Sequence, residues 1–296
     1  MGKLYGIIQP YLKYCIRMRY IPMNYLIAAD SSSNLPAGSG VAIVPLKIIT
    51  DQREFLDDAG LDLNEMLSYL QSYKGRSGTS CPNVSDWLEA IGDTPQSFIV
   101  TITSGLSGCC NAAMQAKAVC EEQGQQVCVL DSLSTGPEMM LIVRKLQELS
   151  DAGVSFEDAE VQIRQYMTHT HLMFSLENLT NLARNGRVSP LVAKAAGLLG
   201  IRIVGKASDV GTLEPMHKCR GQKKALETLA REMGALGFRG GRVHIAHCCN
   251  EAAAAELSEL LTAAHPGCEI QIEHCTGLCS FYAEKGGLLV GFEDSL

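Results

Sequence analysis

Basic clusters and aromatic side chains are both scarce in this chain of 296 residues. The formal net charge is −7, whereas a surface that binds phosphates needs clustered lysine and arginine. Phenylalanine, tryptophan and tyrosine together make up 6% of the residues, too few for a platform on which bases stack. We therefore expect no nucleic-acid partner.

Long uninterrupted apolar runs are also missing, and none reaches the length of a membrane-spanning helix. We therefore expect no stable membrane insertion. The 12 cysteines lie within apolar patterns, as Cys120 does in a helical stretch and Cys128 in a strand-like run. This placement favours buried thiols in a reducing, cytoplasmic compartment over a disulfide framework.

Acidic residues are absent from positions 1–22, where the charged residues are Lys3, Lys13, Arg17 and Arg19. These positions also lack the uncharged apolar core and cleavage site of a signal peptide. The pattern favours a disordered N-terminal extension over residues 1–22. A helix lying on a membrane surface is the alternative.

Strand-like and helix-like patterns alternate through most of the chain. Short apolar runs at 25–29, 97–103 and 126–130 are each followed by polar residues and then by helical spacing. This alternation is typical of a parallel sheet covered by helices on both faces. A second series of strands begins at 172–175. We predict an α/β fold with an N-terminal domain at 23–168, a C-terminal domain at 169–296 and a ligand cleft between them.

Two further segments complete this description of the first half. The apolar, β-branched residues 41–49 predict one strand, and the polar, glycine-containing residues 74–80 predict a loop. In the second half, residues 201–204 and 212–216 predict a pair of strands, and residues 185–189 predict a turn between two helices.

The loop from Ser104 to Ser107 follows the apolar strand 98–103 and precedes a helix. Free backbone N–H groups at a helix start favour an anion, and both serines add hydroxyl donors. The alternative is that Ser107 is simply the N-cap of the helix. The loop lacks the spacing of a nucleotide-binding glycine motif, so no nucleotide cofactor is expected.

Candidate catalytic groups lack partners in the sequence. Cys81 follows Thr79 and Ser80 at the start of a helix, but no nearby histidine supplies a base. Asp30 and Asp131 follow strands, where acids also serve as caps or turn formers. We therefore assign no catalytic residue.

Clustered histidines and cysteines near the C-terminus raise the question of a metal site. They are His244, His247, Cys248, Cys249, Cys275 and Cys279. Their spacing lacks the paired ligands of a zinc motif, and strand residues three apart point to opposite faces. Structural burial is favoured, and no metal is expected.

An ordered set of short motifs spans residues 25–292 and resembles the DegV family. They are Asp30-Ser31-Ser32, Leu35-Pro36, Pro45-Leu46, Asp57-Asp58, Thr79-Ser80-x-Pro82, Ser104-x-Leu106-Ser107-Gly108, Asp131-Ser132, Gly186-Arg187-Val188-Ser189, Ile201 to Val204, Gly211, Lys218 and Arg220. Bacterial members of that family serve as fatty-acid-binding subunits of a fatty acid kinase.

The resemblance implies a non-catalytic protein of phospholipid metabolism that holds a long-chain fatty acid such as palmitate between two α/β domains. It implies that Thr79 and Ser107 bind the carboxylate, with Ser80 and Ser104 close by, through charge-assisted hydrogen bonds. Arg187 is a candidate for the head group or for the partner surface. A separate ATP-dependent kinase would then phosphorylate the exposed carboxylate.

The chain departs from the family pattern near its end. The expected late His-x-Gly-Pro-Gly segment is missing, and residues 283–287 are Ala-Glu-Lys-Gly-Gly. We hypothesise that Lys285 replaces the histidine as a cation. Two other functions stay open: a small-molecule transferase that uses Asp30 or Asp131, and a binder of another anionic small molecule.

Overall fold

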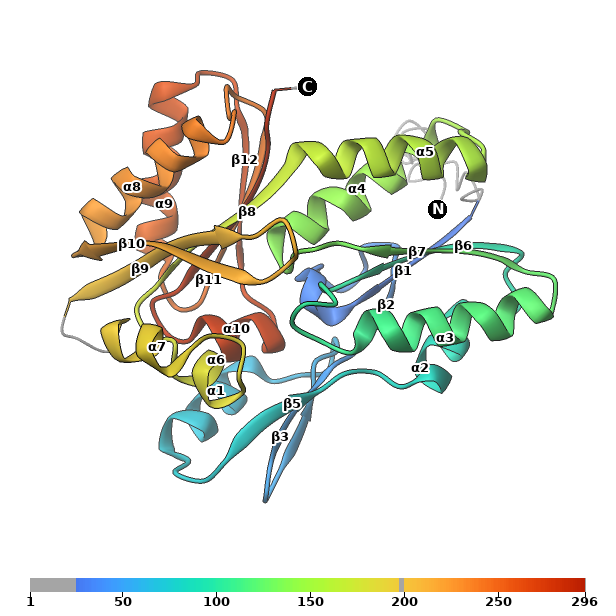
Figure 1. Cartoon of the computed structure of the whole chain (residues 1–296), viewed down its shortest axis with the longest axis horizontal. Helices are drawn as coiled ribbons and strands as arrows, with labels where there is room; N and C mark the ends of the chain where they lie inside the picture. The colour runs from blue at the N-terminus through green and yellow to red at the C-terminus, as the bar shows by residue number, and fades with distance from the viewer. Residues whose placement is uncertain (1–24, 197–199, 296) are drawn as a thin grey trace, which may run out of the picture.

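The computed structural model describes residues 25–196 and 200–295, and their strands form three sheets (Figure 1). The predicted extension at 1–22 lies outside the described residues. The sequence prediction of an α/β fold is confirmed.

The first sheet is parallel and has the strand order β2-β1-β6-β7. Its strands are β1 (Leu26–Asp30), β2 (Ala42–Val44), β6 (Gln96–Thr101) and β7 (Gln126–Asp131). Helices α2 (Val84–Ile91) and α3 (Cys109–Glu122) cover one face, and α4 (Pro137–Asp151) and α5 (Phe156–Tyr166) cover the other (Figure 1). Alternation along β6 explains both layers, since Phe98 and Val100 pack under α4 and α5 whereas Ile99 packs under α2 and α3.

A small antiparallel sheet, β4-β3-β5, lies beside the first. It contains β3 (Lys47–Thr50), β4 (Glu54–Leu56) and β5 (Ser77–Ser80), and α1 (Leu63–Ser72) lies between β4 and β5 in the chain. Two sequence predictions were wrong here. The single strand at 41–49 divides into β2 and β3, because Pro45 has no N–H and Leu46 N donates to Ser31 Oγ over 3.0 Å.

The second error is the loop predicted at 74–80, of which residues 77–80 form β5. Glycine, here Gly78, is depleted in strands, and the serines on either side of Gly78 and Thr79 have no apolar surface to bury. β5 forms because its backbone pairs with β3, where Ile48 lies opposite Thr79. This tertiary pairing places Thr79 on an ordered strand instead of a loop.

The third sheet is mixed and has the order β10-β9-β8-β13-β11-β12. Its strands are β8 (Thr170–Leu176), β9 (Ile201–Ala207), β10 (Leu213–Arg220), β11 (Arg242–His247), β12 (Glu269–His274) and β13 (Leu288–Glu293). The helices of this half are α6 (Thr180–Arg184), α7 (Pro190–Ala196), α8 (Gln222–Ala235), α9 (Glu251–Ala264) and α10 (Gly277–Ala283). The predicted strand pair at 201–216 and the turn between α6 and α7 are confirmed.

Two helices pack across the sheets. Helix α4 contacts β1 and β6 of the first sheet and also β8, β11 and β13 of the third. Helix α10, which follows β12, contacts β3, α1 and α6 (Figure 1). Strands up to β7 belong to the first two sheets and strands from Thr170 onward to the third, while the domain boundary at 168/169 stays a prediction.

A buried acid at the start of α4 makes the stability of this packing sensitive to pH. Glu138 is 6% exposed and accepts a hydrogen bond from Thr170 Oγ1 over 2.8 Å. Burial raises the pKa of Glu138 to about 7 from 4.5. Because the folded pKa exceeds the unfolded one, the stabilising contribution is complete below pH 4.5 and is lost as pH rises through about 7.

We therefore expect Glu138→Gln to raise the free energy of unfolding by roughly 2–3 kcal/mol at pH 8 and to change it little below the unfolded pKa. Urea denaturation at both pH values measures this difference. Glu157→Gln is the matched control, since Glu157 is an exposed acid in the first turn of α5. Equal effects of the two substitutions at pH 8 would contradict the prediction.

Candidate functional site

A largely apolar cavity lies between the first and third sheets. The empty space in it, together with the solvent-filled space at its open mouth, amounts to about 650 Å³. One wall is β8, whose residues Leu172, Phe174 and Leu176 all line the cavity. These residues alternate along the strand, so their side chains share one face, and the row extends over about 13 Å at roughly 3.3 Å per residue. The apolar lining therefore extends along the strand.

The facing walls come from other parts of the chain. Leu46 and Ile102 contribute from the N-terminal half, and α10 contributes Leu278 and Tyr282 from one helical face. The start of α10 is fixed by Asp57, a buried carboxylate that accepts from the N–H groups of Gly277 over 2.7 Å and Leu278 over 3.0 Å. Asp57 thereby positions the helix that lines the cavity.

Five polar side chains line this apolar wall, and contacts link four of them: Thr79, Ser107, Arg187 and Tyr282. The fifth is Thr135. Thr79 Oγ1 and Tyr282 Oη lie 2.7 Å apart in a hydrogen bond. Burial raises the pKa of Tyr282, so its phenol stays protonated and can donate. This part of the cavity therefore offers several hydrogen-bond donors to an anion.

Arg187 is the cation at this position, and backbone carbonyls hold it in place. Its Nε donates to Leu106 O over 3.1 Å and its Nη1 donates to Asn185 O over 2.5 Å. Its guanidinium carbon lies 5.9 Å from the centre of the Tyr282 ring. A guanidinium has five N–H donors, and these two bonds use two of them. A fixed cation with further donors suits a carboxylate.

The structure thus brings together Thr79, Ser107 and Arg187 from the predicted set, but neither Ser80 nor Ser104 lines the cavity. Ser80 Oγ donates to Cys81 O over 3.2 Å. Ser104 is exposed, and its backbone N–H donates to the Asp131 carboxylate over 3.1 Å. The geometry therefore separates these two serines from the proposed head-group site.

The alternative role of Ser107 as N-cap is wrong, because the N-cap of α3 is Gly108. The Ser107 hydroxyl accepts from Cys109 N over 3.3 Å and donates to Cys109 Sγ over 3.2 Å. A thiol sulfur is a weak acceptor, so an anion can compete for the Ser107 hydroxyl proton.

Sequence reasoning missed Tyr282 and pointed to Lys285 instead. Lys285 is exposed in the turn between α10 and β13 and does not line the cavity. Tyr282 carried no sequence signal, since a lone tyrosine in an apolar helix is typical of a core residue. Its role depends on the packing of α10 against the small sheet, where Tyr282 bonds to Thr79, and residue spacing does not reveal that contact.

The two acids considered as general bases, Asp30 and Asp131, accept hydrogen bonds from backbone N–H groups. Asp30 is fully buried, and its carboxylate accepts from Ile102 N over 2.7 Å and from Ser32 N over 3.1 Å. Burial raises the pKa of Asp30 to about 6. Asp131 accepts from the N–H groups of Ser104 and Leu133. Both carboxylates hold loops at the ends of strands, and neither lines the cavity.

Cys81 lies beside this polar region and has an unusual acidity. A hydrogen bond with the Cys109 thiol lowers the pKa of Cys81 to about 6, and the charge of Arg187 acts in the same direction. The same contact raises the pKa of Cys109. The hydrogen bond from Cys109 and the charge of Arg187 therefore both favour the thiolate form of Cys81.

We expect the rate at which iodoacetamide alkylates Cys81 to rise with pH, with a midpoint near pH 6. By pH 7 the rate should be close to its plateau. Peptide mass spectrometry after brief labelling over a pH series measures this rate. Cys109→Ala removes the hydrogen-bond donor and moves the midpoint upward. A wild-type midpoint near 8.5, the ordinary value for cysteine, would show that the thiol is unperturbed.

Among the described residues, no helix is both long enough and apolar enough to cross a membrane.

Comparison with known proteins places these features in a family. The family model with the description "Uncharacterised protein, DegV family" matches residues 25–294. A DegV domain-containing protein of Streptococcus pneumoniae is 41% identical over 279 residues, which cover 92% of this chain and 99% of that protein.

Two solved structures extend the comparison. One is a DegV family protein from Eubacterium eligens loaded with heptadecanoic acid, with 44% identity, a TM-score of 0.89 and coverage of 92% of this chain and 100% of that one. The other is the Streptococcus pneumoniae fatty acid kinase (Fak) B3 protein loaded with linoleic acid, with 40% identity, the same TM-score and the same coverage. Both family model and relatives span nearly the whole described chain, and the chain therefore belongs to the DegV family.

Proposed function

We propose that this protein binds a long-chain fatty acid, with the acyl chain in the cavity along β8 and the carboxylate at Thr79, Ser107 and Arg187. The observation that carries the proposal is a largely apolar cavity whose lining includes hydroxyl donors and the cation Arg187 beside the hydrogen-bonded pair Thr79 and Tyr282. The relatives loaded with heptadecanoic and linoleic acid support the same class of ligand.

The two parts of the cavity have different roles in this proposal. Each buried methylene contributes roughly 0.8 kcal/mol, so the apolar wall supplies most of the affinity. The donors fix the orientation of the acid. Moving a carboxylate out of water without hydrogen-bond partners would cost more free energy than burial of the neighbouring methylenes provides. Tyr282 joins the polar end through its hydrogen bond to Thr79.

The proposal extends to a partner. The likeness to a fatty acid kinase B3 protein supports a role as the subunit that presents the carboxylate to an ATP-dependent kinase. The carboxylate site suits this role because Ser107 is only half-buried and the preceding Ser104 and Gly105 are exposed. A non-catalytic binding role also agrees with the engagement of Asp30 and Asp131 in loop hydrogen bonds. The described cysteines are free thiols, which supports a cytoplasmic setting.

Lipid extraction from the purified protein, followed by mass spectrometry, tests the binding proposal. We expect one long-chain acid per chain, and a higher Tm when palmitate is added to delipidated protein. No extracted acid together with no shift in Tm sinks the proposal. Transfer of phosphate from ATP to the bound acid by a kinase subunit from the same organism tests the second part separately.

A further inference from the structure

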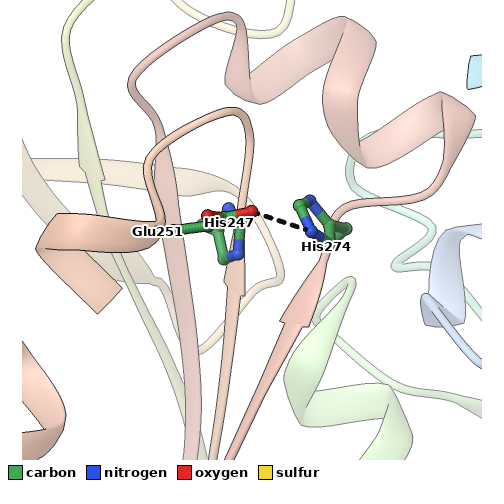
Figure 2. Close-up of side chains that lie close together, drawn as sticks. All are labelled: His247, Glu251 and His274. Carbon is green, nitrogen blue, oxygen red and sulfur yellow. Dashed lines mark ion pairs between the residues drawn. The ribbon is translucent and has the colours of Figure 1, made fainter. Parts of the chain in front are cut away.

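A second cluster of ligating side chains lies at the carboxyl ends of β11 and β12, outside the acyl cavity. His247 ends β11 and His274 ends β12, and the parallel register places these two residues opposite one another. Glu251 is the first residue of α9, one short turn after His247. Figure 2 shows the three side chains converging from two neighbouring strand ends and one helix start.

The three side chains are spaced for one ion. One ligand atom from each of the three residues lies within 4.8 Å of the other two. The imidazole rings are 4.3 Å apart between centres and inclined by 59°. His274 Nε2 lies 3.2 Å from Glu251 Oε1 (Figure 2). An ion placed among them would therefore reach two nitrogens and one carboxylate oxygen.

His247 is the buried member of the cluster, with 2% of its surface exposed. An imidazole nitrogen with a free lone pair is the group that binds a metal. The N–H of Asn250 donates to His247 Nδ1 over 3.3 Å, a long contact, so no strong hydrogen bond holds that lone pair.

The surroundings leave room for a hydrated ion. The cluster opens into a cleft that is also lined by Asn64 and Leu67 of α1 and by Cys249. Cys249 is exposed and has a φ of 50° in the turn that joins His247 to Glu251. Left-handed backbone at a non-glycine residue is uncommon, and here it curls the chain so that Glu251 returns toward His247.

We propose that His247, His274 and Glu251 bind a divalent transition-metal ion of the Zn²⁺ class. Two imidazoles and one carboxylate form a donor set that Zn²⁺ uses where a further coordination position is open to water. The His274–Glu251 contact alone is a surface ion pair, with side chains 63% and 74% exposed, and such pairs contribute little to stability. A shared ion accounts for the convergence of all three residues, including the buried one.

The ion would also fix the peptide segment that leads into α10, the helix that lines the acyl cavity. Three residues after His274, α10 begins at Gly277, and Asn34 bridges this segment by donating to His274 O over 3.0 Å and accepting from Thr276 N over 2.7 Å. A metal at His274 would therefore clamp β12, β11 and the start of α9 together just before α10. This site is independent of the proposed acyl ligand.

Zn²⁺ titration of reduced, chelator-treated full-length protein, followed by competition with a chromogenic chelator, tests the site. We expect one tight equivalent in the wild type, and an affinity at least about tenfold weaker in His274→Ala and in Glu251→Gln. His217→Ala is the matched control, because His217 also pairs with a glutamate, Glu232, over 3.0 Å but has no second histidine there. The control should bind Zn²⁺ as the wild type does.

Two further measurements separate the site from thiol binding and from misfolding. The Co²⁺ form should lack thiolate charge-transfer absorption, and Cys249→Ser should retain the tight equivalent. His274 is exposed, so His274→Ala should keep the wild-type Tm in the absence of metal. Unchanged Zn²⁺ affinity in His274→Ala and Glu251→Gln, or loss of the equivalent in Cys249→Ser alone, overturns the proposal.

Discussion

Leu172→Trp is expected to weaken palmitate binding about 100-fold while changing laurate binding by no more than about threefold. Leu172 begins the row that lines the cavity on β8, and Leu176 ends it close to α6 and the turn that carries Arg187. A bulky side chain at the far end of the row displaces the terminal methylenes of a long acid. Losing three or four methylenes at roughly 0.8 kcal/mol each accounts for the 100-fold change.

Met173→Trp is the matched control for this substitution. Met173 is the next residue of β8, is fully buried, and packs in the core on the opposite face of the sheet. Both variants carry the cost of overpacking, roughly 1–3 kcal/mol of stability, but only the change at Leu172 alters the ratio of the two affinities. Isothermal titration with both acids measures that ratio. An equal loss for palmitate and laurate would show that the acyl chain does not extend along β8.

The fold was largely predictable because its core elements carry strong local signals. Residues 97–103 and 126–130 are short apolar runs bounded by polar residues, and they became β6 and β7 of a parallel sheet. The start of α5 likewise depends on a local cap, since the Ser155 hydroxyl accepts from Asp158 N. Apolar runs and helix caps depend on residues that are close together in the sequence, so residue patterns can predict them.

The small sheet was not predictable in the same way. β5 contains Ser77, Gly78, Thr79 and Ser80, of which only Thr79 favours a strand, and pairing with β3 makes the segment a strand. The same pairing sets Thr79 opposite Ile48 and within hydrogen-bond distance of Tyr282, which is 203 positions away in the chain. No pattern of neighbouring residues in the sequence predicts a contact over that separation.

In the candidate site, too, some residues were predictable from sequence motifs and others only from tertiary packing. Thr79, Ser107 and Arg187 were found through ordered motifs, whereas Tyr282 emerged only from the packing of α10. The cluster of His247, Glu251 and His274 was missed because its two histidines come from different strands. Spacing within one strand correctly separates His244 from His247, but it says nothing about the neighbouring strand that supplies His274. Parallel register, not motif spacing, brings the two rings together.

Thr79→Val is expected to weaken palmitate and laurate by the same factor, about 10- to 100-fold. Valine matches threonine in shape but cannot donate, and a hydrogen bond to a charged group contributes roughly 1.5–3 kcal/mol. The loss should be much smaller for hexadecanol, whose neutral head group gains less from the hydrogen bond.

Two variants isolate the role of the Thr79 hydroxyl. Tyr282→Phe removes the same Thr79–Tyr282 hydrogen bond of 2.7 Å but keeps the threonine donor, so its effect on palmitate should be the smaller one. Ser80→Ala removes the adjacent hydroxyl, which does not line the cavity, and should leave both affinities unchanged. A loss in Ser80→Ala equal to that in Thr79→Val, or a loss in Thr79→Val that grows with chain length, would place the carboxylate elsewhere. Because Leu172→Trp acts on chain length and Thr79→Val on the head group, the two variants together determine which way the acid lies in the cavity.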